Sequence, residues 1–318
     1  MMNLSDPEIL FIDSTHPLLP ESLEQAGFIC EQYPGYKYND FLKIIGKYSG
    51  IIIRSGISPD RQFLEKAVNL KFIARVGAGM ENIDEDFARS RGIICFNAPE
   101  GNRDAVAEHT LGMLLVLMNN LLRADTQVRK GQWLREENRG EEIMGKTIGI
   151  IGYGNMGSAF AQRLSGFGAR VIAYDKYKTC YSCNFVEECD MHTVFNETDI
   201  LSLHVPLTAE TDYLVNNEYL ANFSKPIRLI NTSRGRVVKT SDLIKKIEEG
   251  KVTGAALDVI EYEKKTLENL ENIPADFNYL AQSDKIVLSP HIAGWTKESS
   301  AKLAEVLVKK ILENFRAK

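Results

Sequence analysis

The feature that most constrains the fold of this chain is a group of three glycines, Gly152, Gly154 and Gly157, spaced as G-x-G-x-x-G. An apolar run over residues 147–151 comes first and predicts a strand, and residues 158–167 have helical spacing. A strand, a glycine turn and a helix in that order are typical of a βαβ unit whose helix N-terminus binds the pyrophosphate of a dinucleotide. The spacing therefore predicts an α/β fold with a Rossmann dinucleotide-binding domain.

Asp175 indicates which dinucleotide binds. It ends the next predicted strand, residues 171–174. A carboxylate at that point accepts hydrogen bonds from the ribose hydroxyls of NAD and repels the 2′-phosphate of NADP. A capping aspartate is the alternative interpretation, and Lys176 and Lys178 leave room for NADP. We predict NAD as the cofactor.

Predicted strands and helices alternate along the whole chain. Five strands in the first hundred residues predict a small flavodoxin-like domain, at 9–12, 28–32, 50–54, 70–76 and 93–96, with helical spacing at 40–47 and 60–68. Six further strands predict the Rossmann domain, at 147–151, 170–174, 200–204, 228–231, 253–258 and 285–288. A long helix is expected over 103–130, an irregular acidic loop over 261–283 and an amphipathic helix over 297–315. All connections favour parallel sheets.

Composition excludes several classes of partner. The 318 residues are 44% hydrophobic and 25% charged, with a net charge of −5, so there is no basic surplus for binding nucleic acid. The longest apolar stretch, residues 111–122, is too short to span a bilayer, so no membrane is expected. The N-terminus lacks the pattern of a signal peptide, and a cytoplasmic location is the default expectation.

The five cysteines predict reduced thiols rather than a disulfide framework, because they are odd in number and scattered in a large chain. Cys180, Cys183, Cys189 and His192 could supply four ligands to zinc. The second half of that set does not have a usual zinc spacing, so the favoured interpretation is a loop that carries thiols, with no metal.

Three polar residues follow the ends of the later strands: Arg234, Glu263 and His291. The carboxyl ends of strands form the ligand-binding edge of such a sheet, so these side chains should face the nicotinamide. Histidine can take the hydroxyl proton as hydride leaves C2, and a carboxylate on its other nitrogen would fix the tautomer. A guanidinium would bind the substrate carboxylate through two parallel hydrogen bonds. The trio predicts oxidation of a small 2-hydroxy acid, or reduction of its keto form.

The choice of histidine has alternatives. His204 also ends a strand and is the rival base, whereas His16, His109 and His192 have no matching partners in the sequence pattern. His291 is preferred because Pro290 and the Ala293-Gly294 pair constrain the backbone beside it.

At this point the chain resembles the D-isomer-specific 2-hydroxyacid dehydrogenase family over nearly its whole length. Besides the glycine motif, the matching segments are 74–84 (ARVGAGMENID), 97–99 (NAP), 105–108 (AVAE), 204–208 (HVPLT), 231–235 (NTSRG), 255–259 (AALDV) and 289–294 (SPHIAG). The family's Arg, Glu and His fall on Arg234, Glu263 and His291. Glu263 is followed by Lys264 where the family often has proline, and Glu261 lies close by, so the identity of the carboxylate stays open.

The resemblance implies an architecture and a set of ligand contacts. Residues 1–98 and 292–318 would form the substrate domain and 99–291 the NAD domain, with the active site in the cleft and domain closure excluding water. The helix after Arg103 would make a homodimer. The residues expected to contact NAD are Gly152, Gly154, Asn155, Met156, Gly157, Asp175, His204, Val205, Pro206, Thr232, Ser233, Asp258, Ala293 and Gly294. Those expected to contact the acid are Arg54, Ser55, Val76, Gly77, Ala78, Gly79, Asn102 and Arg135, with 76–79 as a backbone anion nest.

Two arginines bear on which acid is bound. Arg54-Ser55 matches a pair that contacts substrate in 3-phosphoglycerate dehydrogenases, and Arg135 resembles a residue that reaches the phosphate from a neighbouring subunit. Two cations suit a phosphate, so 3-phosphoglycerate, as used in serine biosynthesis, is the favoured substrate. Arg54 could instead bind a carboxylate, and Arg135 could pair with Glu136 or Glu137. Reduction of glyoxylate or hydroxypyruvate is the enzymatic alternative, and an NAD-sensing co-repressor-like binding module is the alternative of another class.

Overall fold

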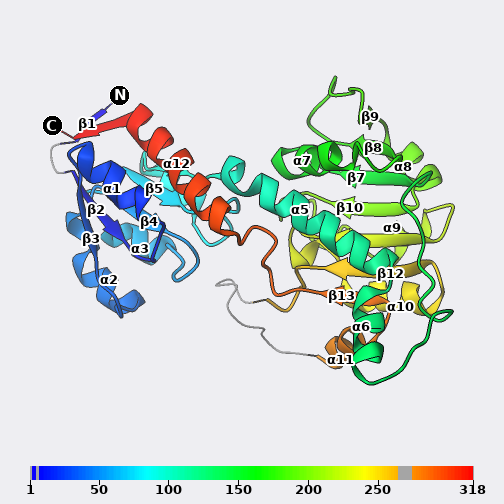
Figure 1. The fold of residues 1–318 in the computed structure, drawn as a ribbon. Helices are drawn as coiled ribbons and strands as arrows, with labels where there is room; N and C mark the ends of the chain where they lie inside the picture. The colour runs from blue at the N-terminus through cyan, green and yellow to red at the C-terminus, as the bar shows by residue number, and fades with distance from the viewer. Residues whose placement is uncertain (1, 5–6, 264–273, 318) are drawn as a thin grey trace. The chain divides into compact units, whose positions relative to one another are not determined.

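The computed structural model describes residues 2–4, 7–263 and 274–317 and divides the chain into two compact units (Figure 1). Among the described residues, unit 1 comprises those up to Asn102 and those from Trp295 onward, and unit 2 comprises those from Arg103 to Gly294. The sequence places the two boundaries a few residues earlier, after residues 98 and 291.

Unit 1 is built on a parallel sheet of five described strands in the order β3-β2-β4-β5-β6. They are β2 (Glu8–Phe11), β3 (Ile29–Gln32), β4 (Gly50–Ile53), β5 (Phe72–Arg75) and β6 (Ile94–Phe96). The helices are α1 (Leu18–Gln25), α2 (Tyr38–Ile44), η1 (Ile45–Lys47), α3 (Arg61–Lys66), α4 (Glu85–Ser90) and α12 (Lys297–Asn314). A separate parallel pair, β1 (Met2–Leu4) with β14 (Phe315–Ala317), brings the two chain ends side by side (Figure 1). The order of the five strands is the predicted flavodoxin-like arrangement.

Alternating side chains of the unit 1 strands enter two apolar clusters, one on each face of the sheet. On β2, Ile9 and Phe11 join the cluster that contains residues of α1 and α12, while Leu10 joins the cluster of α2, α3 and α4. This follows from the two-residue period of a strand. Gly50 opens β4 because a Cβ there would lie 2.2 Å from the ring of Phe72.

Unit 2 is built on a parallel sheet of seven described strands in the order β13-β12-β11-β10-β7-β8-β9. They are β7 (Thr147–Ile151), β8 (Arg170–Tyr174), β9 (Glu187–Glu188), β10 (Ile200–Leu203), β11 (Ile227–Asn231), β12 (Val252–Leu257) and β13 (Ile286–Leu288). The chain runs from β7 outward to β9 and then returns to place β10 on the other side of β7. Ligands bind at such a point of reversal, beyond the carboxyl ends of the strands. Six of these strands are predicted from the sequence, and the two-residue β9 is too short to be.

One predicted helix of unit 2 is divided into two in the structure. The helices are α5 (Pro99–Met118), whose residues up to Asn102 belong to unit 1, α6 (Leu121–Arg129), α7 (Asn155–Leu164), α8 (Met191–Glu197), α9 (Asn217–Ala221), η2 (Gly235–Val237), α10 (Thr240–Glu248) and α11 (Ala275–Gln282). The single helix expected over 103–130 is wrong: α5 and α6 meet at a bend of 62°. Asn120 has a φ of 53°, a left-handed conformation that asparagine tolerates better than most residues.

No described helix is by itself long and apolar enough to cross a membrane, and only α5 and α6 counted together, despite their bend, reach that length and hydropathy. Leu114 and Leu117 of α5 are buried in the core of unit 2.

The loop expected over 261–283 also needs correction, because α11 occupies its second half. Pro274 directly precedes α11, a position where proline suits a helix start. The rest of that predicted loop, 264–273, lies outside the described residues.

Candidate active site

The three glycines between β7 and α7 differ in their surroundings. A Cβ on Gly152 would lie 2.5 Å from the carbonyl oxygen of His204, and one on Gly157 would lie 2.0 Å from that of Gly152. A Cβ on Gly154 would meet open space. The packing of the protein therefore accounts for two of the glycines. The third keeps the backbone accessible, as the approach of a pyrophosphate requires.

The start of α7 adds positive potential at the same turn. Gly154 is the residue before the helix and no side chain caps it, so the N–H groups of Asn155 and Met156 have no partner from a cap. The helix dipole adds to these donors. An open glycine and an uncapped helix start together fit the pyrophosphate of NAD.

Asp175 follows β8 and is held by the backbone around it. Its Oδ2 accepts a hydrogen bond of 2.8 Å from the N–H of Tyr153, and its Oδ1 accepts from the N–H groups of Tyr177 and Lys178 at 2.9 and 3.0 Å. Lys176 forms an ion pair with Glu210, and Lys178 donates to the carbonyl oxygen of Tyr153. The two lysines that could favour a 2′-phosphate thus have other partners, which agrees with NAD.

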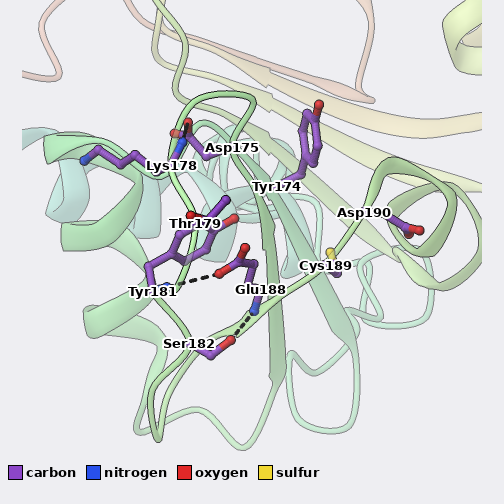
Figure 2. A pocket seen from close by; sticks show the side chains of 9 residues that line it. All are labelled: Tyr174, Asp175, Lys178, Thr179, Tyr181, Ser182, Glu188, Cys189 and Asp190. Atoms are coloured by element: carbon purple, nitrogen blue, oxygen red, sulfur yellow. Dashed lines mark hydrogen bonds between the residues drawn. The ribbon is translucent and has the colours of Figure 1, made fainter.

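A depression of about 490 Å³ adjoins Asp175, and Figure 2 shows the side chains that line it. They are Tyr174, Asp175, Lys178, Thr179, Tyr181, Ser182, Glu188, Cys189 and Asp190. Three are carboxylates and one is a cation, so the lining suits hydroxyl groups better than a phosphate. Glu188 ties the loop down: it accepts from the N–H of Tyr181, and its own N–H donates to Ser182 (Figure 2).

His291 and Glu263 form the closest pair of predicted catalytic residues. The Nδ1 of His291 lies 2.6 Å from Oε2 of Glu263, and both side chains are mostly buried. The other oxygen of Glu263 accepts from the N–H of Ile260 at 2.6 Å. Glu261 points elsewhere, since its Oε1 accepts from the N–H of Thr240. Of the two acidic residues that the sequence left open, Glu263 is the one that contacts the histidine.

The backbone of His291 is constrained by Asp258. His291 has a φ of 55°, which is unusual for a residue other than glycine. The Asp258 carboxylate accepts from the N–H groups of Ile292 and Ala293 at 2.9 and 2.8 Å, and its carbonyl oxygen accepts from the N–H of His291 at 2.7 Å. The sequence assigned Asp258 to the cofactor, and the structure also makes it the anchor of the histidine loop.

Asp258 stays ionised although it is buried. Burial raises the pKa of its carboxyl group, but hydrogen bonds from His109, Ser289 and the two backbone N–H groups outweigh that effect and leave the pKa below its usual value. The Ser289 hydroxyl donates to Asp258 at 2.5 Å, and His109 Nε2 lies 3.0 Å from the same hydroxyl. The expectation that His109 has no partner is therefore wrong. These partners lie far apart in the sequence, so no local pattern could have revealed the network.

Arg234 lies in a segment fixed from both sides. Asn231 Oδ1 accepts from the N–H and hydroxyl of Ser233, and its amide donates to the carbonyl oxygen of Arg234 at 2.9 Å. Gly235 packs closely enough that a Cβ there would lie 1.9 Å from the carbonyl oxygen of Ile260. The segment that carries Arg234 therefore adjoins the one that leads to Glu263.

His204 does not have the surroundings of a catalytic base. Its Nε2 lies 2.8 Å from the Ser202 hydroxyl, and its Nδ1 is buried without a hydrogen-bond partner among the described residues. Burial lowers the pKa of His204 to about 3. A histidine with so low a pKa accepts a proton poorly near pH 7 and is seldom protonated there, so the structure favours His291 over this rival.

Other residues predicted to contact NAD follow the carboxyl ends of the strands in unit 2. The hydroxyl of Thr232 lies 3.0 Å from that of Thr110 in the core. Val205 approaches the position that a Cβ on Gly152 would take, and Pro206 accepts from Thr211. Gly294 is the last residue of unit 2.

The residues predicted to bind the acid lie mostly in unit 1. The loop after β5 is held because Gly77 and Ala78 accept hydrogen bonds from the Ala98 N–H and the Asn97 amide. The predicted nest over 76–79 is only half available, because the N–H groups of Val76 and Gly77 donate to the carbonyl oxygens of Ile53 and Arg75. Among the described residues the N–H groups of Ala78 and Gly79 have no acceptor, as an anion nest requires. Asn102 carries a buried Oδ1 that likewise lacks a hydrogen-bond partner in the described chain.

Arg54 and Ser55 follow β4, which pairs with β5. Ile53 and Arg75 are partners across these strands, so Arg54 and Val76 begin neighbouring loops. The guanidinium of Arg54 stacks on the indole of Trp295, with Cζ 4.3 Å from the ring centroid. No local sequence pattern could predict this contact, because the two residues lie at opposite ends of the chain.

Arg135 lies on an exposed segment of unit 2, and the structure does not bring it to the other predicted site residues. Neither suggested ion pair forms: Glu136 pairs with Arg139, and the carbonyl of Glu137 accepts from Arg123. Its predicted role depends on a second subunit and stays a prediction.

The cysteines near Asp175 do not gather into a metal site. In the described residues no group of three or more histidine, cysteine or carboxylate side chains is placed to hold a metal ion. Cys180 and Cys183 are exposed, whereas burial raises the pKa of Cys189 to about 11. Cys183 forms part of a tight loop in which Tyr181 stacks on Tyr153 at 4.4 Å between ring centroids.

Comparison with known proteins places the chain in a family. Residues 111–293 match the model of the D-isomer specific 2-hydroxyacid dehydrogenase, NAD binding domain. A hydroxypyruvate reductase of Thermotoga maritima is 35% identical over 86% of this chain and 87% of the relative. A D-3-phosphoglycerate dehydrogenase of Bacillus subtilis is 34% identical over 86% of this chain, which spans 53% of the length of that relative.

A solved structure gives the same result for the fold. The D-lactate dehydrogenase from Aquifex aeolicus, complexed with NAD and lactic acid, superposes with a TM-score of 0.82 at 29% identity, covering 95% of this chain and 93% of the other. The predicted two-domain α/β fold and the NAD cofactor are confirmed by these matches.

Proposed function

This chain belongs to the D-isomer specific 2-hydroxyacid dehydrogenase family and is an NAD-dependent oxidoreductase, and we propose that its substrate pair is 3-phosphoglycerate and 3-phosphohydroxypyruvate. The observation that carries the proposal is the position of Arg54 in unit 1. Arg54 begins the loop beside the one that holds the Ala78 and Gly79 N–H groups. A backbone anion nest suits the carboxylate of the acid, and a guanidinium suits a second anion such as a phosphate.

The reacting groups are assigned to unit 2. His291 donates a proton from Nε2 to the C2 oxygen as the keto acid is reduced, because Glu263 occupies its Nδ1. Glu263 fixes this tautomer and stabilises the imidazolium that forms in the reverse direction. Arg234 binds the substrate carboxylate and polarises the carbonyl. NADH, when bound at the glycine turn, supplies the hydride. Asp258 keeps the histidine loop in its left-handed conformation throughout.

Reduction of hydroxypyruvate or glyoxylate is the second candidate. The observation that favours it is similarity: a hydroxypyruvate reductase of Thermotoga maritima is 35% identical to this chain over 86% of its length. Both substrates are 2-keto acids, so the assignments of His291, Glu263 and Arg234 are the same for either.

Turnover measurements separate the candidates. NADH oxidation is followed with phosphohydroxypyruvate, hydroxypyruvate and glyoxylate at equal concentrations. We expect kcat/KM to be highest for phosphohydroxypyruvate, and Arg54→Met should reduce that value more than the value for glyoxylate. Equal kcat/KM with and without the phosphate contradicts the proposed substrate. If no 2-keto acid is turned over while NADH still binds, a co-repressor-like binding module replaces the enzyme.

We also propose that the protein is a homodimer formed through α6 and the segment after it. Large apolar side chains are exposed there, namely Leu121, Leu122, Val128, Trp133 and Leu134. Exposed apolar residues grouped on neighbouring segments are typical of a subunit interface. Light scattering on the purified protein should give twice the chain mass of 35.7 kDa. Leu122→Glu should shift the mass towards the monomer.

A further inference from the structure

The contact between Arg54 and Trp295 suggests a role for a residue outside the family motifs. The guanidinium carbon lies 4.3 Å from the centroid of the indole, inside the range of a cation–π interaction. Both residues belong to unit 1. Trp295 is 68% exposed, so hydrophobic burial does not explain its position.

The backbone of Arg54 is fixed before the stack is considered. Asp13 Oδ2 accepts from the N–H groups of Arg54 and Gly56 at 2.6 and 3.4 Å. The amide of Asn82 donates to the carbonyl oxygens of Arg54 and Ile57 at 3.3 and 3.1 Å. The loop is thus held on both its donor and acceptor sides, and the remaining freedom of Arg54 lies in its side chain.

The stack limits that side-chain freedom without using the hydrogen-bonding edge of the guanidinium. Among the described residues Arg54 forms no ion pair, and the nearby Asp13 carboxylate binds its backbone instead. A carboxylate partner would occupy the N–H donors, whereas an aromatic face covers the flat side and leaves the donors free for an anion. Ordering a long side chain in advance lowers the entropy that ligand binding must remove.

Trp295 is itself well placed by local structure. The next residue, Thr296, caps α12: its hydroxyl accepts from the N–H of Ser299 at 3.0 Å, and the Ser299 hydroxyl accepts from the N–H of Thr296 at 3.1 Å. This reciprocal capping fixes the backbone that carries the indole. The indole therefore stands on a rigid helix start rather than on a loose connection.

We propose that Trp295 is a positioning residue that holds the Arg54 guanidinium ready for the second anionic group of the substrate, and so contributes to selection of a phosphorylated acid. This inference depends on the proposed function, in which Arg54 binds that group. The two can fail separately, because Trp295 acts through Arg54 while Arg54 acts on the substrate.

The kinetic test is a double-mutant cycle with Trp295→Leu, Arg54→Met and the combined variant. Loss of a cation–π contact at an exposed site should raise KM for phosphohydroxypyruvate about two- to fivefold. The KM for hydroxypyruvate should rise less, and kcat for the phosphorylated acid should change little. Trp295→Phe should recover most of the loss because it restores an aromatic face. The combined variant should match Arg54→Met alone, since the two residues act as a unit.

Four results would overturn the inference. Additive effects in the combined variant would show that Trp295 does not act through Arg54. Equal increases in both KM values, or a fall in kcat with thermal destabilisation, would indicate a purely structural role. If Arg54→Met leaves KM for phosphohydroxypyruvate unchanged, the proposed substrate role of Arg54 fails first.

A spectroscopic readout tests the stack independently of substrate. The sequence has two tryptophans, so Trp133→Phe leaves Trp295 as the only one. In that background Arg54→Met should shift the emission of Trp295, and phosphohydroxypyruvate should change it in the parent but not in the Arg54→Met variant. An emission that does not respond to Arg54→Met contradicts the stack itself, whatever the kinetics show.

Discussion

Two loops of this protein are each held in place by one aspartate carboxylate, but the surroundings of the two carboxylates differ. Each follows a parallel strand, and each has a carboxylate that accepts hydrogen bonds from two nearby backbone N–H groups: Asp258 from Ile292 and Ala293, and Asp13 from Arg54 and Gly56. Asp258 holds the loop of His291 in unit 2. Asp13 holds the loop of Arg54 in unit 1.

The difference lies in burial and in what else surrounds each carboxylate. Asp258 is 1% exposed and receives further hydrogen bonds from Ser289 and His109, whereas Asp13 is partly exposed. A buried charge is tolerated only when its hydrogen bonds are satisfied, and losing one is then expensive. The loop of His291 is therefore held by more hydrogen bonds to a more deeply buried carboxylate than the loop of Arg54.

The largest effect is expected when the side chain of His291 is removed from the first loop. His291→Ala should lower kcat about 10²- to 10⁴-fold, the usual contribution of general acid–base catalysis. NADH binding, measured by fluorescence titration, should be retained, because Asp258 anchors the loop through its backbone. Activity that persists in His291→Ala and disappears in His204→Ala would assign the proton transfer to the rival histidine.

The next prediction tests which carboxylate assists His291. Glu263→Gln should lower kcat roughly tenfold or more, but less than His291→Ala, because glutamine can still hold the imidazole while losing the charge. Glu261→Gln is the matched control, since its carboxylate accepts from the N–H of Thr240 and does not contact His291. Steady-state kinetics of both variants give the answer. A larger loss in Glu261→Gln would reverse the assignment.

Asp258→Asn tests the anchor of the first loop. It should lower the free energy of unfolding at pH 7 by about 2 to 3 kcal/mol, because the buried N–H groups and the Ser289 hydroxyl lose a charged acceptor. Chemical denaturation measures this change.

The same anchor predicts a pH dependence. The pKa of Asp258 in the folded protein is lower than the value of about 3.9 expected when unfolded. Its contribution to stability is therefore complete above that value and is lost as the pH falls through the lower, folded pKa. Between about pH 5 and pH 3 the unfolding free energy should fall less steeply in Asp258→Asn than in the parent. Parallel curves would show that the carboxylate does not carry this dependence.

These anchors mark the limit of what the sequence could predict. The glycine turn and the ends of the strands were predictable because strand, turn and helix follow one another within a few residues. The contact of His109 with Ser289 joins residues 180 positions apart, and Trp295 reaches Arg54 from the far end of the chain. Whether Glu261 or Glu263 meets His291 depends on the direction of two side chains. Only tertiary packing fixes such choices.

The smallest expected effect tests the anchor of the second loop. Asp13→Asn should lower the unfolding free energy by about 1 kcal/mol, since its carboxylate is partly solvated and water can replace a lost hydrogen bond. Asp86→Asn is a suitable control because that carboxylate is almost fully exposed. If the loop positions Arg54, Asp13→Asn should also raise KM for phosphohydroxypyruvate several-fold with little change in kcat, the opposite pattern from His291→Ala. A fall in kcat as large as that of the histidine variant would remove the distinction between the two loops, because both would then control the chemical step.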